Sequence, residues 1–109
     1  MQIMDKFYAL SAPIRREIIA LLADSGELPA SLIADNFKIS PPAISQHLKV
    51  LLNTNLVRMH KQAQQHIYEI NPAAMLELEA WAKQIVTSLD AVSGIVTKQN
   101  PEAPLKEVS

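Results

Sequence analysis

The run Ser40-Pro41-Pro42 is the feature of this sequence that most restricts its fold. Proline breaks the interior of a helix but is tolerated in the first turn, where the backbone N–H has no intrahelical partner. A serine directly before that turn can cap the remaining N–H groups. The pattern therefore predicts that a helix begins immediately after Ser40.

The residues after the prolines predict a helix with two different faces. Apolar residues recur at the spacing of one helical face, and polar residues fall on the other. The apolar set is Ile44, Leu48, Leu51 and Leu52, and the polar set is Pro42, Ser45, Gln46, Lys49 and Asn53. Hydroxyl, amide and amine groups hydrogen-bond base edges and phosphates, although most polar helix faces are simply solvated. The face is a candidate surface for reading DNA.

The charge distribution favours that interpretation more than the total charge does. The net charge is −1, yet residues 38–66 contain Lys38, Lys49, Arg58 and Lys61 and no Asp or Glu. Counting Lys and Arg against Asp and Glu, residues 1–37 carry −2, residues 38–66 carry +4 and residues 67–109 carry −3, which total −1. Positive charge confined to one segment is expected where a small part of a protein meets phosphate.

Length and composition exclude several classes of function. A chain of 109 residues predicts one domain, and the absence of cysteine excludes disulfides, thiolate ligands and cysteine nucleophiles. With two glycines there is no phosphate-binding glycine loop, and no Ser-His-Asp set has an orienting context, so we expect neither an enzyme nor a cofactor. No apolar run has the length of a membrane span and the N-terminus lacks the layout of a signal peptide, which predicts a soluble, cytoplasmic protein without membrane insertion.

The segments before Ser40 predict three helices. Ile3, Phe7 and Leu10 suit a short opening helix. Ser11 is the expected cap of a second helix, which Gly26 ends, and Pro29 opens a short third helix to about Asn36. Residues 37–39 then form a tight turn into the Ser40 helix. Two helices joined by such a turn make a helix-turn-helix, whose second helix enters the major groove.

The pattern after the Ser40 helix changes to that of a hairpin. Asn55 tolerates left-handed backbone where the chain leaves the helix. Residues 57–60 and 66–70 alternate at period two, with residues 61–65 as the expected loop. A hairpin in this place is a wing, so the sequence predicts a mainly α winged helix-turn-helix with about five helices.

Three segments resemble the ArsR/SmtB family of bacterial winged-helix repressors over about residues 5–95. They are "ALSAPIRREIIALL", "IADNFKISPPAISQHLKVLLNTNLV", and "YEI" followed by a long helix with a tryptophan. The resemblance implies a homodimeric transcriptional repressor that binds a short inverted repeat and releases it when a signal changes its shape. The chain departs from the family at the wing tip, residues 61–65, which lacks the usual glycine and arginine, and at Asn55, where glycine is common.

The resemblance also implies where a metal sensor of this family would hold its ligands. Those positions are cysteines on the helix before the recognition helix, or pairs of Asp, His and Glu on the last helix. Neither set is present, and His47, His60 and His66 lie instead on the recognition helix and hairpin. Because zinc needs three or four converging ligands, we predict no metal site. His47 suits core packing and phosphate contact equally, whereas His60 and His66 suit surface positions better than DNA contact.

The last helix, from about Ala73, carries an apolar seam that predicts a dimer. Its residues repeat at spacings of three and four from Met75 to Val96, a wider apolar surface than one small domain covers. The opening helix is expected to join it, as the resemblance also implies. The predicted dimer residues are Phe7, Leu10, Leu78, Trp81, Ala82, Ile85, Leu89 and Val92.

These features together predict a homodimeric, DNA-binding repressor on an inverted-repeat operator. The alternative is a winged helix that binds proteins and not DNA. The predicted DNA-binding residues are Ser40, Pro41, Pro42, Ser45, Gln46, His47, Lys49, Arg58, Lys61 and Gln64. Residues 1–98 are expected to form the DNA-binding and dimerisation domain, residues 99–109 a disordered tail, and an unknown small molecule or protein to act as effector.

Overall fold

A computed structural model of the chain describes residues 2–93, and the predicted tail at 99–109 lies outside them. The described residues form five helices and three strands. In chain order they are α1 (Gln2–Leu10), α2 (Pro13–Ser25), β1 (Glu27–Pro29), α3 (Ala30–Asp35), α4 (Pro41–Asn53), β2 (Val57–Gln62), β3 (Gln65–Ile70) and α5 (Pro72–Ser93). The chain divides into two compact units, residues 1–75 and the part from Leu76 onward. None of the described helices is long and apolar enough to cross a membrane.

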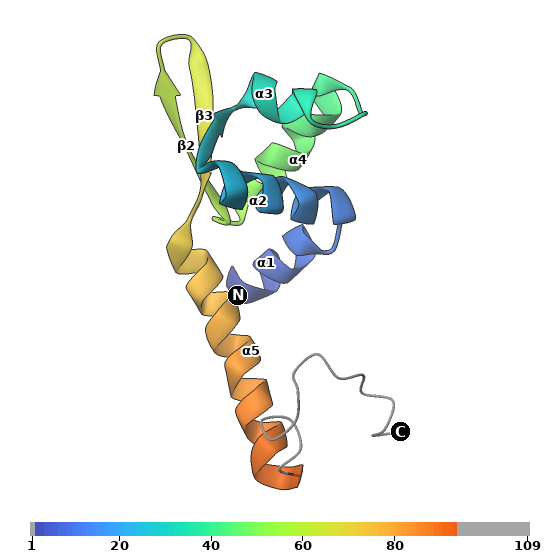
Figure 1. Cartoon of the computed structure of the whole chain (residues 1–109), viewed down its shortest axis with the longest axis vertical. Coiled ribbons are helices and arrows are strands. Elements are labelled where there is room, and N and C mark those ends of the chain that lie inside the picture. Colours follow the sequence, from blue (N-terminus) through green and yellow to red (C-terminus); the bar gives the residue numbers. More distant parts are fainter. Residues whose placement is uncertain (1, 94–109) are drawn as a thin grey trace. The chain divides into compact units, whose positions relative to one another are not determined.

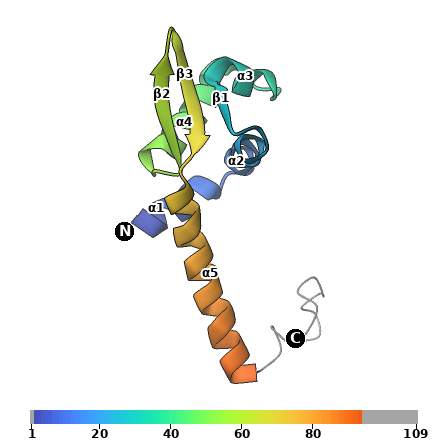
Figure 2. The same cartoon turned by 60° about the vertical axis from the view of Figure 1, so that its left-hand side comes forward.

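The first unit is a helical cluster with a small sheet beside it (Figure 1). Helix α3 packs on α4, and α2 contacts both α4 and β3. The strands are antiparallel in the order β1-β3-β2, so β1 lies along the inner strand of the β2–β3 hairpin (Figure 2). We call the hairpin, residues 57–70, the wing. The predicted winged helix-turn-helix is confirmed.

The core of this unit comes from apolar residues of nearly every element. The fully buried ones include Ile18 and Leu22 of α2, Ile33 of α3, and Ile44, Leu48 and Leu51 of α4. Leu56 and Val57 continue this core into the wing. The 3.6-residue periodicity of α2 and α4 therefore points their apolar faces to one another, as the sequence predicts.

A left-handed residue connects α4 to the wing. Asn55 has φ 64°, and its N–H donates to the Leu52 carbonyl at 3.1 Å, while the Leu56 N–H donates to the Leu51 carbonyl at 3.0 Å. These two bonds are those of a Schellman motif, which ends a helix by satisfying its last carbonyl groups. The role predicted for Asn55 is confirmed.

Two predictions about local structure were wrong, and one strand was not predicted. Ser11 does not cap α2: its hydroxyl donates to the Tyr8 carbonyl at 2.6 Å, closing α1, and Ala12 takes the cap position without a side-chain bond. Strand β1 was not predicted, because three residues that end in proline show no periodicity and form a strand only by pairing with β3. The loop expected at 61–65 is shorter, because cross-strand pairing continues to Gln62 and Gln65 and leaves Ala63 and Gln64 as the turn.

Candidate nucleic-acid interface

Helix α4 begins as the Ser-Pro-Pro run predicts. The backbone of Ser40 is extended, with φ −67° and ψ 151°, and its hydroxyl oxygen accepts a hydrogen bond from the Ala43 N–H at 3.3 Å. Pro41 and Pro42 occupy the first turn, which contains no acidic residue. Because the positive end of the helix dipole lies at this turn, the start of α4 suits an anion such as phosphate.

The polar face of α4 is exposed along its length. Ser40, Pro41, Pro42, Ser45, Gln46 and Lys49 are all exposed, whereas Ile44, Leu48 and Leu51 are buried. The buried residues fix the rotation of the helix about its axis, so the polar side chains point toward solvent. The polar groups of this face are the hydroxyl groups of Ser40 and Ser45, the amide of Gln46 and the amine of Lys49, the types that contact base edges and phosphates.

His47 lies at the edge of this face, and its ring contacts a side chain of α2. It is half-buried, and its Nδ1 lies 3.1 Å from Nη1 of Arg15 in α2. Burial lowers the pKa of the His47 imidazole, and the Arg15 charge lowers it further. Nδ1 of the neutral ring therefore accepts a hydrogen bond from Arg15. This geometry supports the packing role of His47 over the phosphate contact.

Arg15 is a residue whose role the sequence did not predict. It is buried, its Nε donates to the Ala9 carbonyl at 2.6 Å, and its guanidinium stands 5.4 Å from the centre of the Tyr8 ring. One side chain of α2 thus holds the end of α1 and, through His47, the recognition helix α4. Arg15 and His47 are 32 positions apart in the sequence, so no local pattern could reveal their contact.

The three wing residues predicted to contact DNA are all exposed, but one of them is paired with a carboxylate. Lys61 and Gln64 are exposed, near and in the turn at the wing tip. Arg58 is also exposed, but its Nη2 lies 3.5 Å from a carboxylate oxygen of Glu69 on the neighbouring strand. Side chains alternate between the two faces of a strand, so Arg58 and Lys61 point to opposite faces of the sheet. Of these two wing cations, Arg58 is offset by a carboxylate, and Lys61 has no ion pair with a carboxylate among the described residues.

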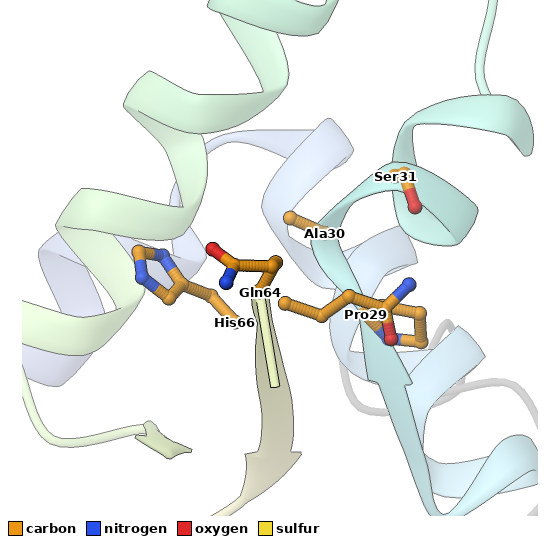
Figure 3. Close-up of a pocket in the computed structure, with 6 residues that line it drawn as sticks. Pro29, Ala30, Ser31, Gln64 and His66 are labelled. Carbon is orange, nitrogen blue, oxygen red and sulfur yellow. The ribbon is translucent and has the colours of Figure 1, made fainter. Parts of the chain in front are cut away.

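His60 and His66 are exposed, as predicted. His66, Gln65 and Gln64 line an open pocket with Pro29, Ala30 and Ser31, where the wing faces the junction of β1 and α3 (Figure 3). His60 lies on the other face of the sheet, and two glutamates of β1 and β3 approach it. This cluster was not predicted from the sequence, because Glu27 lies on β1, a strand that shows no periodicity of its own.

The residues predicted to form a dimer interface divide between the two units. In the first unit Phe7 is exposed and Leu10 is half-buried. In the second unit Leu78 is half-buried, and the exposed members are Trp81, Ala82, Ile85, Leu89 and Val92. Their spacing of three and four residues places them along one side of α5.

Comparison with known proteins identifies the class of this fold. Residues 12–59 match the family described as "Bacterial regulatory protein, arsR family". The transcriptional repressor SdpR of Bacillus subtilis (strain 168) is 33% identical over 84 residues, which cover 77% of this chain and 92% of that protein. The family match at residues 12–59 includes all of α3 and α4 and the first residues of β2.

Solved structures of the same class have the same fold. The ArsR-like transcriptional regulator from Rhodococcus sp. RHA1 superposes with a TM-score of 0.73 at 25% identity, covering 91% of this chain and 93% of that one. The homodimeric winged helix-turn-helix DNA-binding domain Mb0332 from Mycobacterium bovis gives 0.65 at 24% identity, covering 83% of each.

The chain belongs to the arsR family of bacterial regulatory proteins. It is a DNA-binding transcriptional regulator and not an enzyme, which confirms both predictions from the sequence. Membership also favours DNA binding over the alternative of a winged helix that binds only proteins.

Proposed function

We propose that this chain is a homodimeric repressor that binds an inverted-repeat operator through α4 in the major groove. The observation that carries the proposal is the exposed, acid-free face of α4, backed by buried Ile44, Leu48 and Leu51. The similar protein SdpR is a transcriptional repressor, which supports repression over activation for this chain. Such a protein acts where bacterial DNA is, in the cytoplasm.

The side chains of α4 have separate roles in this proposal. Gln46 reads a base pair, because a glutamine amide pairs bidentately with the N6 and N7 edge of adenine. Pro42 and Ser45 contact the neighbouring base edges, and Lys49 contacts the backbone. The Ser40 end of the helix receives a phosphate, where N–H groups and the helix dipole favour negative charge.

The wing contributes mainly through charge at its tip. Lys61 supplies a phosphate contact and Gln64 a weaker polar one, because the tip carries no arginine to insert into the minor groove. Arg58 contributes less than its charge suggests, since Glu69 offsets it.

The dimer proposal rests on the apolar seam of α5. Ile85 is 45% and Val92 is 88% exposed, and both lie on the same side of the helix. Apolar side chains repeated over several turns match a helix–helix interface between identical chains. The Mycobacterium bovis domain of the same fold is homodimeric. A two-fold dimer would place its two α4 helices in major grooves about 10 base pairs apart, which requires an inverted repeat.

A gel-shift assay with the DNA upstream of the protein's own gene tests DNA recognition. The proposal expects a discrete complex whose affinity falls steeply between two salt concentrations, because phosphate contacts release counterions. Random DNA of the same length is the control. Equal affinity for both DNAs would show non-specific binding only, and no binding to either would favour the protein-interaction alternative.

Sedimentation of Ile85→Asp tests the dimer. A carboxylate buried in the seam is unpaired in both copies, so we expect a monomer at concentrations where the wild type is a dimer. Thr87→Asp is the matched control, because position 87 falls on the opposite side of α5. A dimer in Ile85→Asp would place the interface elsewhere.

The proposed repressor does not sense metal through the family's usual sites. The chain has no cysteine, and α5 contains no histidine. A small molecule or a protein partner is therefore the proposed class of effector. Native mass spectrometry of protein purified from its host would show a retained ligand and the dimer together. It would contradict this view if the only extra mass were a metal that is lost when the α5 carboxylates Glu77, Glu79 and Asp90 are substituted.

A further inference from the structure

One face of the sheet gathers three potential metal ligands. An oxygen of Glu27 in β1, a ring nitrogen of His60 in β2 and an oxygen of Glu69 in β3 all lie within 4.8 Å of one another. Strand register explains the cluster: Glu69 is the direct partner of both Glu27 and Arg58, and His60 is two residues beyond Arg58 on the same face. Each of the three strands contributes one ligand.

The types of these ligands indicate which ion they suit. An imidazole nitrogen with two carboxylate oxygens suits zinc and neighbouring first-row ions, whereas magnesium and calcium favour oxygen alone. Ligands of a tetrahedral zinc ion lie about 3.3 Å apart, given bonds of about 2.0–2.1 Å. His60 and Glu27 are exposed and Glu69 is half-exposed, so rotation of the side chains alone can close the remaining gap. A water molecule would complete the fourth position.

The charges around the cluster also favour a cation. Glu27 and Glu69 are directly opposite one another on adjacent strands, an arrangement in which like charges destabilise a sheet. Arg58 lies 3.5 Å from Glu69 and offsets one of the two carboxylates. Among the described residues, ion pairing with Arg58 therefore leaves the second carboxylate, Glu27, beside the His60 ring without a cation to offset it.

We propose that Glu27, His60 and Glu69 form a binding site for a divalent transition-metal ion, with zinc the ion that the ligand set favours. This departs from the prediction of no metal site, because the three ligands come together only when β1 pairs with β3. A bound ion would link all three strands. Because β1 ends at Pro29, the cap residue of α3, the ion would also tie the base of the wing to the helix-turn-helix.

Isothermal titration of the purified full-length chain with zinc chloride, without DNA, tests this site independently of the proposed repressor function. We expect one zinc ion per chain, with affinity reduced about 10–100-fold or more in His60→Ala and in Glu27→Gln. The matched control is His66→Ala, which removes an exposed histidine from the other face of the same sheet and should bind like the wild type. Magnesium chloride at the same concentrations should give no binding.

Arg58→Ala adds a result of opposite sign. Removing the guanidinium frees Glu69 and takes away a repelling charge, so zinc should bind more tightly. Thermal unfolding checks that every variant folds, and zinc should raise the melting temperature of the wild type but not of His60→Ala. The proposal is overturned if the wild type binds no zinc, if His60→Ala binds as well as the wild type, or if Arg58→Ala binds more weakly.

Discussion

The recognition helix and the part of the wing up to His66 contain no acidic residue, yet the fold surrounds them differently. The exposed face of α4 is backed by apolar core residues, so no carboxylate approaches it from that core. The wing pairs with itself and with β1, and this brings Glu69 to Arg58 and Glu27 to Glu69. A stretch without acids in the sequence remains without acids in space only where its neighbours are also uncharged.

Introducing a carboxylate into each region gives the largest contrast. In Ser45→Glu a negative charge meets the base edges and phosphates of the groove, and we expect operator affinity to fall by about 3 kcal/mol or more. In Gln64→Glu the same change at the wing tip should cost about 1 kcal/mol. Fluorescence anisotropy with labelled operator measures both. Equal losses would mean that the wing is as close to DNA as α4.

Gln46→Ala sharpens the assignment within α4. We expect a loss of about 1–3 kcal/mol of discrimination at one base pair, with little change in binding to random DNA. The measurement is a comparison of operators substituted at each position. If affinity for random DNA falls as much as affinity for the operator, Gln46 contacts the backbone and reads no base.

Two cations distinguish the regions by salt dependence. Lys49→Ala should weaken binding to all DNA and reduce the slope of log K against log salt by about 1, because one phosphate contact is lost. Arg58→Ala should change the slope much less, since Glu69 already neutralises the guanidinium. A larger effect at Arg58 would show that DNA draws this side chain away from Glu69.

Asn55 connects the two regions, and its substitution tests the backbone between them. Alanine is disfavoured at φ 64°, so Asn55→Ala should lower the free energy of unfolding by about 1 kcal/mol. Asn55→Gly should be neutral or stabilising, because glycine adopts this conformation without strain. Chemical denaturation measures both, and an Asn55→Ala variant as stable as Asn55→Gly would contradict the role of the Schellman motif.

The pH dependence of stability tests the contact between Arg15 and His47. The pKa of His47 is lowered in the folded chain, so the unfolded chain binds this proton more tightly. The stabilisation from neutral His47 is therefore complete above its ordinary pKa of 6.5 and is lost as the pH falls through the folded-state value. We expect acid to destabilise the wild type more than His47→Gln in parallel denaturation curves. Parallel losses in the two proteins would show that this histidine does not titrate with folding.

Local chemistry made much of the fold predictable. The start of α4 depends on three adjacent residues, Ser40, Pro41 and Pro42, and the end depends on Asn55, so the sequence contains both signals. The exposed face of α4 was also predictable, because the 3.6-residue period of a helix fixes which of its residues are buried and which point outward. The period-two alternation after α4 predicted the wing, and the three- and four-residue spacing of apolar residues predicted the last helix.

Features that depend on distant pairing were not predictable. Strand β1 exists because residues 27–29 pair with residues 67–69, and Arg15 gains its role only when α2 meets α4. Ser11 was misassigned because a serine between two helices can bond to either, and the carbonyl of Tyr8 is the partner it finds. The glutamates near His60 and Arg58 were not predicted, because they come close only when β1, β3 and β2 pair.

The outward face of α4 as the DNA-reading surface is tested most directly by an NMR titration of the labelled protein with operator DNA. The account predicts that the largest amide and side-chain shifts fall at Ser45, Gln46 and Lys49, with smaller shifts at Lys61 and Gln64. Shifts confined to the wing or to α2, with the α4 face unchanged at saturation, would contradict it.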